Sequence, residues 1–369
     1  MHVVRALVVD DSTIFRLLVS NTLSLLPDVS VVGRCRDGKS AIESIRIEKP
    51  DLVTLDVEMP IMGGLETMKE IRRLAQTEEA FRKVRVVMLS SQTKEGADIT
   101  IQSMNEGAME CIPKPNEGDV DANQESLKLN LGRAVEVVRA QLEALSPSSK
   151  PKSAPIPPIR SMPPRIDAIA GPIPAKPRGF QKPQVICIGV STGGPAALST
   201  MLPELSLKTH LPILIVQHMP PGFTKSLAES LDKKCRHKAV EATEGELLEN
   251  DRIYIAPGGR HMTVVEQGGT RKIALTDAPA ENGCRPAVDV LFRSAAKIFG
   301  SNQLAIILTG MGSDGTLGGK VMKEKGVCVL VQDKASSVVW GMPGSAVDAG
   351  IADEVLPLMK IPESVAKLL

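Results

Sequence analysis

Short apolar runs alternate with stretches of helical spacing along the first third of the chain. The apolar runs cover Ala6 to Val9, Val29 to Gly33, Leu52 to Leu55 and Val84 to Leu89, and the first helical stretch covers Ser12 to Leu26. Short apolar runs between helical patterns are typical of parallel strands that are buried on both faces. We therefore expect this region to form a parallel sheet with helices on both sides.

The pattern changes abruptly after a last predicted helix at Leu127 to Leu145. Residues 146–183 contain eleven prolines mixed with Lys, Arg, Ser and Ala. Such a composition cannot bury a core and favours a semi-extended, polyproline-like chain. We predict two domains, at 1–145 and 184–369, joined by this proline-rich linker. Its simplest role is a tether, and a docking motif for partners is the less favoured alternative.

The alternation resumes in the second domain. Five apolar runs predict buried strands at Val185 to Ile188, Pro212 to Gln217, Arg252 to Ile255, Leu304 to Leu308 and Val327 to Val331. Five helices are predicted to begin at Pro195, Thr224, Val288, Thr316 and Ser345. Met262 to Val265 and Lys272 to Leu275 predict a hairpin inserted between two of these units. The fold class is thus α/β, with two doubly wound parallel-sheet domains, the second in three layers.

Composition narrows the class of protein without indicating a special partner. Lys and Arg number 44 against 43 for Asp and Glu, and aromatic residues make up only 2%, so nothing favours binding to nucleic acid. The six cysteines lack the spacing of a zinc site or a disulfide framework, which fits a reducing cytoplasm. The apolar start runs into Asp10-Asp11, unlike a signal peptide, and no apolar stretch approaches the roughly 20 residues that span a bilayer. We expect a cytoplasmic monomer without membrane insertion.

Acidic residues follow the strands of the first domain, at the edge where parallel sheets bind ligands. Asp10 and Asp11 follow the first apolar run, and Asp56 follows the third. Three converging carboxylates repel one another unless a hard divalent cation such as Mg²⁺ neutralises them. Ser90 and Lys114 follow later strands, and the whole set suits a phosphoryl group on one carboxylate. Any one of these residues alone would be interpreted as a solvated turn residue; all five in register favour the phosphoryl site.

Residues 3–145 resemble the receiver domain of bacterial response regulators. The matching motifs are Leu7-Val8-Val9-Asp10-Asp11-Ser12, Asp56 with Met59-Pro60 and Gly63-Gly64, Ser90, and Lys114-Pro115. The resemblance implies a five-stranded, flavodoxin-like fold and phosphorylation of Asp56 by a histidine kinase. It also implies that Mg²⁺ is bound by Asp10, Asp11, Asp56 and a backbone carbonyl near Glu58. The switch residues that it implies are Ser90 and Lys114.

Two positions beside the lysine depart from this family's pattern. Receivers usually carry an aromatic residue three positions before it, whose ring moves inward on activation. Here that residue is Cys111, a small thiol without the volume of a ring. Pro113 is also unusual, because proline removes a backbone donor at the end of a strand. We therefore expect the relay from Asp56 to the surface to depend mainly on Ser90.

A serine flanked by glycines marks the second domain. Gly189 to Gly194 lie between the apolar run Val185 to Ile188 and Pro195, a pattern that predicts strand, sharp turn and helix. Ser191 would lie at the helix N-terminus, where unpaired amides and the helix dipole stabilise an oxyanion. Gly-x-Ser-x-Gly is the spacing of a nucleophile elbow. Such turns also hold phosphates, but the third glycine and the lysine of nucleotide-binding loops are missing.

A serine nucleophile needs a base, and the base needs a group that orients it. His218 ends an apolar run at the same sheet edge as Ser191, and His261 is a competing candidate. Asp314 follows a glycine-rich turn at that edge, where it would accept the hydrogen of the imidazole Nδ1. Taken alone, Asp314 would be interpreted as the N-cap of the next helix and His218 as a structural residue. The chain order Ser, His, Asp differs from that of α/β-hydrolases.

Residues 184–365 resemble the catalytic domain of the CheB family, the chemotaxis protein-glutamate methylesterases. The matching motifs are Ile188-Gly189-Val190-Ser191-Thr192-Gly193-Gly194-Pro195, Gln217-His218-Met219-Pro220, Phe223-Thr224, Tyr254-Ile255-Ala256-Pro257-Gly258, Arg285-Pro286-Ala287-Val288-Asp289, Leu308-Thr309-Gly310-Met311-Gly312-Ser313-Asp314-Gly315 and Val338-Val339-Trp340-Gly341-Met342-Pro343. The resemblance implies hydrolysis of glutamate γ-methyl esters on methylated chemoreceptor cytoplasmic domains, often with glutamine deamidation.

The same resemblance assigns roles to residues of this chain. Ser191 would be the nucleophile, His218 the general base and then acid, and Asp314 the orienting carboxylate. Backbone amides near Thr192 and Met311 would hold the oxyanion. No cofactor is implied for ester hydrolysis, so Mg²⁺ would serve only receiver phosphorylation. Cys284 departs from the family, which commonly has a histidine before the Arg-Pro motif, and this affects the expected substrate contacts.

The resemblance also implies how the receiver domain regulates the esterase domain. The family's unphosphorylated receiver covers the esterase entrance, and phosphorylation of Asp56 by a chemotaxis histidine kinase loosens that packing. Coupling of about 1 to 3 kcal/mol between two sites changes activity about 5- to 150-fold. The alternative is a phosphorylation-controlled docking protein for receptors or kinase, whose output domain has no catalytic activity.

Overall fold

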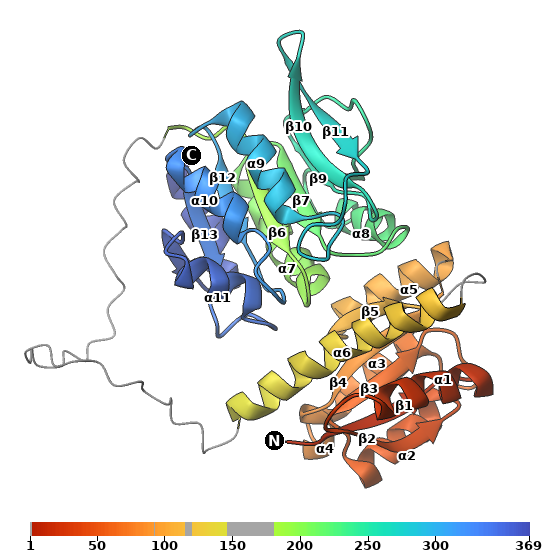
Figure 1. Ribbon diagram of the computed structural model, residues 1–369. Coiled ribbons are helices and arrows are strands. Elements are labelled where there is room, and N and C mark those ends of the chain that lie inside the picture. The colour runs from red at the N-terminus through yellow and green to blue at the C-terminus, as the bar shows by residue number, and fades with distance from the viewer. Residues whose placement is uncertain (1, 92, 115–119, 146–180) are drawn as a thin grey trace, which may run out of the picture.

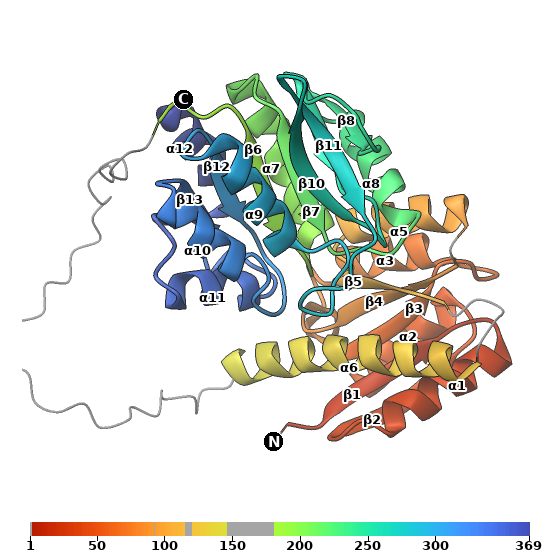
Figure 2. The same ribbon diagram turned by 45° about the horizontal axis from the view of Figure 1, so that its top comes forward.

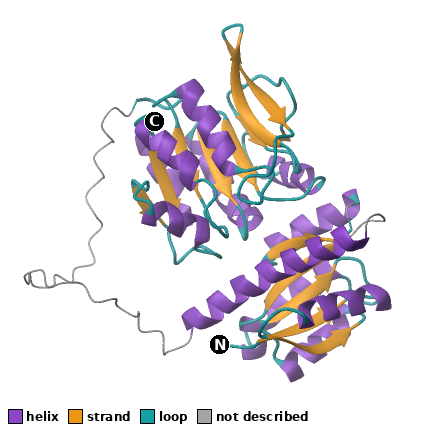
Figure 3. Ribbon diagram, viewed as in Figure 1, coloured by secondary structure: helices purple, strands orange, loops and turns teal. Residues whose placement is uncertain are grey.

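Two α/β domains make up the described part of the chain (Figure 1). The computed structural model describes residues 2–91, 93–114, 120–145 and 181–369. The predicted linker lies outside these residues, except for 181–183. Figure 3 shows the strands as a middle layer between helices in both domains, so the predicted fold class is confirmed. Within the described ranges, every helix is too short or too polar to cross a membrane.

The first domain is a five-stranded parallel sheet with strand order β2-β1-β3-β4-β5. The strands are β1 (Val4–Val9), β2 (Val29–Cys35), β3 (Leu52–Asp56), β4 (Arg85–Ser90) and β5 (Glu110–Pro113). The helices are α1 (Thr13–Ser24), α2 (Gly38–Glu48), α3 (Gly64–Leu74), α4 (Glu79–Arg82), α5 (Lys94–Asn105) and α6 (Val120–Leu145). Alternate residues of β1 face opposite ways: Ala6 and Val8 pack with α1 and α6, and Leu7 and Val9 with α2, α3 and α5.

The second domain is a seven-stranded parallel sheet with strand order β14-β13-β12-β6-β7-β9-β8. The strands are β6 (Ile186–Val190), β7 (Ile213–Gln217), β8 (Lys238–Glu241), β9 (Arg252–Ile255), β12 (Leu304–Ile307), β13 (Cys328–Gln332) and β14 (Glu354–Leu356). The antiparallel hairpin consists of β10 (His261–Gln267) and β11 (Thr270–Thr276). The helices are α7 (Gly194–Lys208), α8 (Phe223–Asp232), α9 (Val288–Phe299), α10 (Thr316–Glu324), α11 (Gly341–Asp348), η1 (Leu358–Lys360) and α12 (Ile361–Leu368).

Both sheets have a point where the strand order reverses. It lies beside β1 and β3 in the first domain and beside β6 and β12 in the second. Ligands of open α/β sheets bind at the carboxyl ends of the strands at such points. The predicted phosphorylation site follows the first pair of strands, and the predicted catalytic serine follows β6.

Two predicted helix starts were wrong. Helix α11 begins at Gly341 rather than Ser345, with Pro343 in its first turn. Proline is tolerated there, because the first turn of a helix has no use for the N–H that proline lacks. Helix α6 begins at Val120 rather than Leu127, because it extends beyond the residues with apolar spacing. The unpredicted strands β8 and β14 are short edge strands with charged residues, which carry little apolar signal.

The two domains pack against each other through α5 and α6 of the first (Figures 1 and 2). Helix α5 contacts α7 and α8, and their apolar residues belong to one continuous buried cluster. Polar contacts also cross the interface: Gln141 Nε2 donates to Val338 O at 2.7 Å, and Lys94 Nζ lies 3.7 Å from a Glu229 carboxylate oxygen. Apolar packing and exposed polar contacts therefore share this interface.

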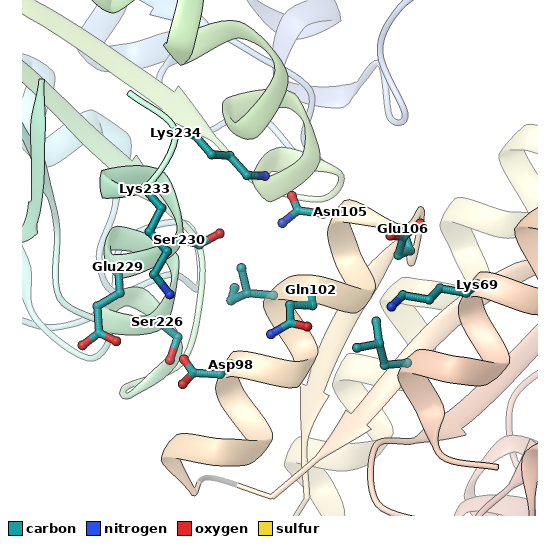
Figure 4. Close-up of a pocket in the computed structure, with 12 residues that line it drawn as sticks. Lys69, Asp98, Gln102, Asn105, Glu106, Ser226, Glu229, Ser230, Lys233 and Lys234 are labelled. Carbon is teal, nitrogen blue, oxygen red and sulfur yellow. The ribbon is translucent and has the colours of Figure 1, made fainter. Parts of the chain in front are cut away.

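One end of the interface is hollow and polar. A cavity of about 390 Å³ lies between α3 and α5 of the first domain and α8 of the second (Figure 4). Charged and amide side chains from both domains line it, including Lys69, Gln102 and Glu229. Water can solvate these side chains while the two domains are packed against each other, which is the closed arrangement of the protein. This part of the interface therefore adds little to the cost of separating the domains.

Candidate active site

Ser191 is the first residue after β6, in the turn that leads into α7. Gly193 has a φ of 77°, a left-handed conformation that allows the chain to reverse sharply there. The loop after β12 approaches the serine closely, because a Cβ on Gly310 would lie only 2.8 Å from Ser191 Cβ. The Ser191 amide donates to Thr309 O at 3.0 Å, which ties the two loops together. Gly193 thus allows the sharp turn after the serine, and Gly310 allows the second loop to approach it closely.

The three residues predicted as a triad lie in one hydrogen-bonded chain. His218 follows β7, and its Nδ1 lies 3.1 Å from Ser191 Oγ. His218 Nε2 lies 2.8 Å from Asp314 Oδ2. The serine and histidine come from adjacent strands, since Val190 pairs with Gln217 in the β6–β7 ladder. The geometry is that of a nucleophile, a base and an orienting carboxylate.

The predicted orientation of the imidazole was wrong. We expected Asp314 to accept the hydrogen of Nδ1, but it faces Nε2. Nδ1 is the ring nitrogen nearer the backbone, and Ser191 lies at the end of the neighbouring strand. The near nitrogen therefore reaches the serine, and the far nitrogen reaches across to the loop that follows β12.

Asp314 is buried and accepts hydrogen bonds at both carboxylate oxygens. Oδ2 accepts from Val288 N at 2.7 Å, and Oδ1 accepts from Asp289 N at 2.9 Å and Gly315 N at 3.0 Å. Burial opposes ionisation, but the His218 contact and the amides of Asp289 and Val288 bring the pKa of Asp314 below its usual value. Asp314 is thus held as an anion by the N-terminus of α9. The alternative that it caps α10 was wrong, because that helix has Gly315 as its N-cap without a side-chain cap.

Two residues that support the site were not predicted. Asn282 donates to Asp314 Oδ1 at 3.1 Å and to Asp289 Oδ2 at 3.0 Å, and so links two buried carboxylates. Its φ of 53° fits the turn that an Asn-Gly pair predicts, but that signal gives no hint that the turn returns to the triad. Gln217 donates through Nε2 to Ser191 O at 3.0 Å and fixes the serine turn.

The environment of His218 favours its protonated form. Burial lowers the pKa, but hydrogen bonds to Asp314 and Cys284 outweigh it and raise the pKa of His218 to about 9. Cys284 Sγ lies 3.5 Å from His218 Nδ1, on the same nitrogen that faces the serine. The family departure noted in the sequence therefore lies directly against the predicted base. We expected Cys284 to affect substrate contacts, but the thiol also contacts the predicted base itself.

His261, the competing candidate for the base, is fully buried and serves the fold. Its Nδ1 accepts from Ala287 N at 3.1 Å, and its Nε2 lies 3.0 Å from Pro279 O. The amide donor fixes the tautomer, so Nε2 carries the hydrogen and donates to the carbonyl. Neither nitrogen is available to a substrate or to Ser191.

The residues predicted to form the oxyanion hole border the same cavity as Ser191. This cavity of about 440 Å³ is lined by Thr192, Met311 and residues of both domains. Within the described ranges, the backbone amides of Thr192 and Met311 donate no hydrogen bond to another residue. Their role in the oxyanion hole remains a prediction. It is consistent with two amides at the cavity that are free to donate to a bound oxyanion.

The predicted phosphorylation site lies at the strand ends of the first domain. Lys114 Nζ lies 2.8 Å from both Asp10 Oδ2 and Asp56 Oδ2. Burial raises the pKa of Asp56 to about 6, against the opposing effect of Lys114, and burial also raises the pKa of Asp10. Ser90 is buried and donates to Ser91 O at 3.1 Å.

These residues fit a hard divalent cation. Carboxylate oxygens of Asp10, Asp11 and Asp56 lie within 4.8 Å of one another. Oxygen donors of net negative charge are what Mg²⁺ prefers, and a bound cation would relieve the burial of two carboxylates. The carbonyl near Glu58 remains a prediction, since the Glu58 side chain is exposed and lies outside this group.

Family models match both domains. The model described as "Response regulator receiver domain" matches residues 6–122, and the model described as "CheB methylesterase" matches residues 186–365. A protein-glutamate methylesterase/protein-glutamine glutaminase of Desulfotalea psychrophila is 41% identical over 99% of this chain and 98% of its own. The chain belongs to the CheB family. A Geobacillus kaustophilus CheB-type protein of the same description is also 41% identical, over 100% of this chain and 99% of its own.

A solved CheB structure is similar to the second domain. The CheB methylesterase catalytic domain of Thermotoga maritima is 44% identical and covers 51% of this chain and 100% of its own, with a TM-score of 0.50. The relatives of Desulfotalea psychrophila and Geobacillus kaustophilus align along nearly the whole chain, and so through both matched domains.

Proposed function

We propose that this protein hydrolyses glutamate γ-methyl esters on the cytoplasmic domains of chemoreceptors and deamidates glutamines there, under control of phosphorylation at Asp56. The full-length relatives named above carry both activities in their descriptions. The observation that carries the proposal is the hydrogen-bonded chain of Ser191, His218 and Asp314 at the switch point of the second sheet. The reaction takes place in the cytoplasm, where receptor tails and the kinase are found.

Catalysis begins when Ser191 Oγ attacks the ester carbonyl carbon and His218 Nδ1 takes its proton. The bond to the methoxy group then breaks, and Nδ1 returns the proton so that methanol leaves. Water attacks the acyl-serine with Nδ1 again as base, and the glutamate and the serine are released. With glutamine, ammonia is the leaving group. Asp314 holds the Nε2 hydrogen throughout and stabilises the imidazolium.

The oxyanion forms at the N-terminus of α7. The amides of Thr192 and Met311 donate to it, and the helix dipole adds a favourable field. Loss of one such donor typically reduces kcat by about 10² to 10³. The dipole of α9 acts at the other end of the triad, where its first amides hold Asp314 charged. Two helix N-termini thus stabilise the two negative charges of the transition state.

Control is exerted by the receiver. A chemotaxis histidine kinase transfers its phosphoryl group to Asp56, and Lys114 and Ser90 bind the phosphoryl oxygens. Asp10, Asp11 and Asp56, with the carbonyl near Glu58, would hold Mg²⁺, which neutralises the charge of the phosphoryl group during transfer. Phosphorylation weakens the closed packing of α5 and α6 on the methylesterase domain.

The test uses the full chain with a methylated receptor cytoplasmic fragment. Ser191→Ala should abolish methanol release and labelling by a fluorophosphonate, whereas Ser313→Ala, at an exposed serine of the neighbouring loop, should retain both. Full methanol release by Ser191→Ala would overturn the esterase mechanism. A docking protein without catalytic activity would release no methanol in any form.

Regulation is tested separately with a small phosphodonor and Mg²⁺. These should raise methanol release by the parent and leave Asp56→Ala unchanged. An equal response of Asp56→Ala and the parent would show that control does not act through this carboxylate.

A further inference from the structure

A glutamate of the receiver lies at the predicted esterase site. Glu110 is the first residue of β5 and lines the same cavity as Ser191, Thr192 and His218. Neither the phosphorylation site nor the triad uses this residue. Among the receiver residues that border the cavity, Glu110 brings a carboxyl group, which is the group that ester hydrolysis would leave on the substrate.

The backbone beside Glu110 is anchored at the same place. Gly193 N donates to Met109 O at 3.2 Å, so a receiver carbonyl accepts from an amide at the N-terminus of α7. Met311, on the other side of the site, packs against the receiver cluster that contains α6. The start of β5 is therefore tied to the serine turn, and the receiver cluster that includes Met109 also contacts the Met311 loop. The hydrogen bond fixes the backbone next to Glu110 at the predicted site.

The electrostatic surroundings of Glu110 are those of a carboxylate subsite. Burial raises the pKa of Glu110 to about 7, while Arg133, His218 and the Thr192 side chain favour the charged form. Arg133 comes from α6, and His218 and Thr192 come from the methylesterase domain. The side chain is partly buried, with positive charge on the side of the predicted base. A substrate glutamate released by ester hydrolysis would meet the same His218 and Thr192.

We propose that Glu110 is an internal mimic of the reaction product: in the closed arrangement its side-chain carboxyl group occupies the subsite for the glutamate γ-carboxyl group of the receptor. The inference rests on the proposed function and identifies both the subsite and the group that blocks it. The receiver then inhibits as an intramolecular competitor and leaves the triad assembled. This agrees with the intact hydrogen bonds of Ser191, His218 and Asp314 in the closed arrangement.

An intramolecular competitor has a kinetic signature. It reduces the fraction of molecules able to bind substrate, so it raises the apparent KM by the reciprocal of that fraction and leaves kcat unchanged. In the unphosphorylated full chain, Glu110→Ala should lower the apparent KM for the methylated receptor fragment at least about fivefold, the lower end of typical coupling between sites. The parent with phosphodonor and Mg²⁺ should show a similarly low KM.

The matched control is Gln141→Ala. It removes the hydrogen bond from α6 to Val338 O, another contact between the domains, but leaves Glu110 in place. Its KM should stay closer to that of the parent. Equal shifts in the two variants, or no shift in Glu110→Ala, would mean that Glu110 is an ordinary interface residue and would overturn the inference.

A second readout tests the subsite itself. In Glu110→Gln, the introduced amide lies where a substrate glutamine would lie, so Ser191 should convert it to the acid with release of ammonia. Mass analysis of the peptide containing position 110 would detect the change, and the added substitution Ser191→Ala should prevent it. If the amide stays intact while the phosphorylated preparation deamidates receptor glutamines, the side chain lies outside the subsite and the inference is wrong. If the same preparation has no activity on receptors, the proposed function fails instead.

Discussion

Asp314→Asn separates the catalytic role of this residue from its structural role. Among the described residues, Oδ1 accepts from three N–H groups, those of Asn282, Asp289 and Gly315, whereas Oδ2 accepts from two, Val288 N and His218 Nε2. An asparagine has one acceptor oxygen and one NH₂ group. Fewest contacts are lost if the oxygen takes the Oδ1 position, so we expect the NH₂ group to face Val288 and His218.

This orientation determines the magnitude of both effects. His218 Nε2 must then accept a hydrogen, which moves the ring proton to Nδ1, the nitrogen that has to deprotonate Ser191. A wrong tautomer of this kind reduces kcat by about 10⁴ in serine hydrolases. The buried Val288 amide loses its acceptor, at a cost of about 1 to 3 kcal/mol. For a domain of this size, that loss lowers Tm by roughly 2 to 12 °C.

The assay combines methanol release from methylated receptor with thermal unfolding, and Asp289→Asn is the matched control. Asp289 is also buried at the start of α9, where it accepts from Gly318 N at 2.6 Å and Asn282 Nδ2 at 3.0 Å, but it does not contact His218. Its replacement should lower Tm and change kcat only a few-fold. If Asp314→Asn lowers Tm but keeps kcat within about tenfold of the parent, Asp314 only stabilises α9 and the triad assignment is refuted.

Three further predictions concern the same site. Because the pKa of His218 is raised to about 9, its base form increases with pH, and fluorophosphonate labelling of the unphosphorylated chain should rise about tenfold from pH 7 to 8 and about fivefold more from pH 8 to 9; a flat profile would contradict this. Iodoacetamide should inactivate the enzyme by placing a group on Cys284, 3.5 Å from His218 Nδ1, and Cys284→Ser should resist it; equal inactivation of both would locate the critical thiol elsewhere. Asn282→Ala should reduce kcat less than Asp314→Asn, because the carboxylate keeps its charge and its amide donors, and should lower stability by about 1 to 3 kcal/mol, measured by urea unfolding. Loss of activity as large as that of Asp314→Asn would mean that Asn282 has a direct role in catalysis.

Most of the site residues that could be predicted from the sequence end a buried strand or directly follow one. Ser191 and His218 come immediately after β6 and β7, and Asp10 comes immediately after β1. In a parallel sheet all such positions share one edge, so their proximity follows from the apolar pattern alone. Loop geometry is not needed to bring them together.

The features that could not be predicted depend on side-chain direction or on long-range packing. Which nitrogen of His218 faces Ser191 depends on the rotamer and on the width of the ladder between two strands. Asn282 reaches the triad through a turn whose path is determined by its contacts with Asp289 and Asp314. Glu110 belongs to the other domain, so no local pattern relates it to Ser191. Local sequence signals carry no information about these tertiary contacts.

Strand β5 connects the two sites without an intervening loop. Glu110 begins the strand, and Lys114, which contacts Asp56, directly follows its last residue. At about 3.3 Å per residue, the two Cα atoms are separated by no more than about 13 Å. Because the strand is short, we expect that a phosphoryl group on Asp56 that draws Lys114 toward itself would displace the start of β5 as well.

The position and composition of β5 limit the number of contacts that such a displacement would break. Among the described strands it is an edge strand that pairs with β4, and Pro113 contributes no N–H to that ladder. Cys111 packs against the core with a small side chain, where a ring would hold the strand more firmly. The two departures from the receiver pattern therefore act in the same direction: each removes a contact that would help to hold the strand that carries Glu110. We therefore expect that in this chain movement of the strand as a whole, rather than of an aromatic ring, links Asp56 to the predicted esterase site.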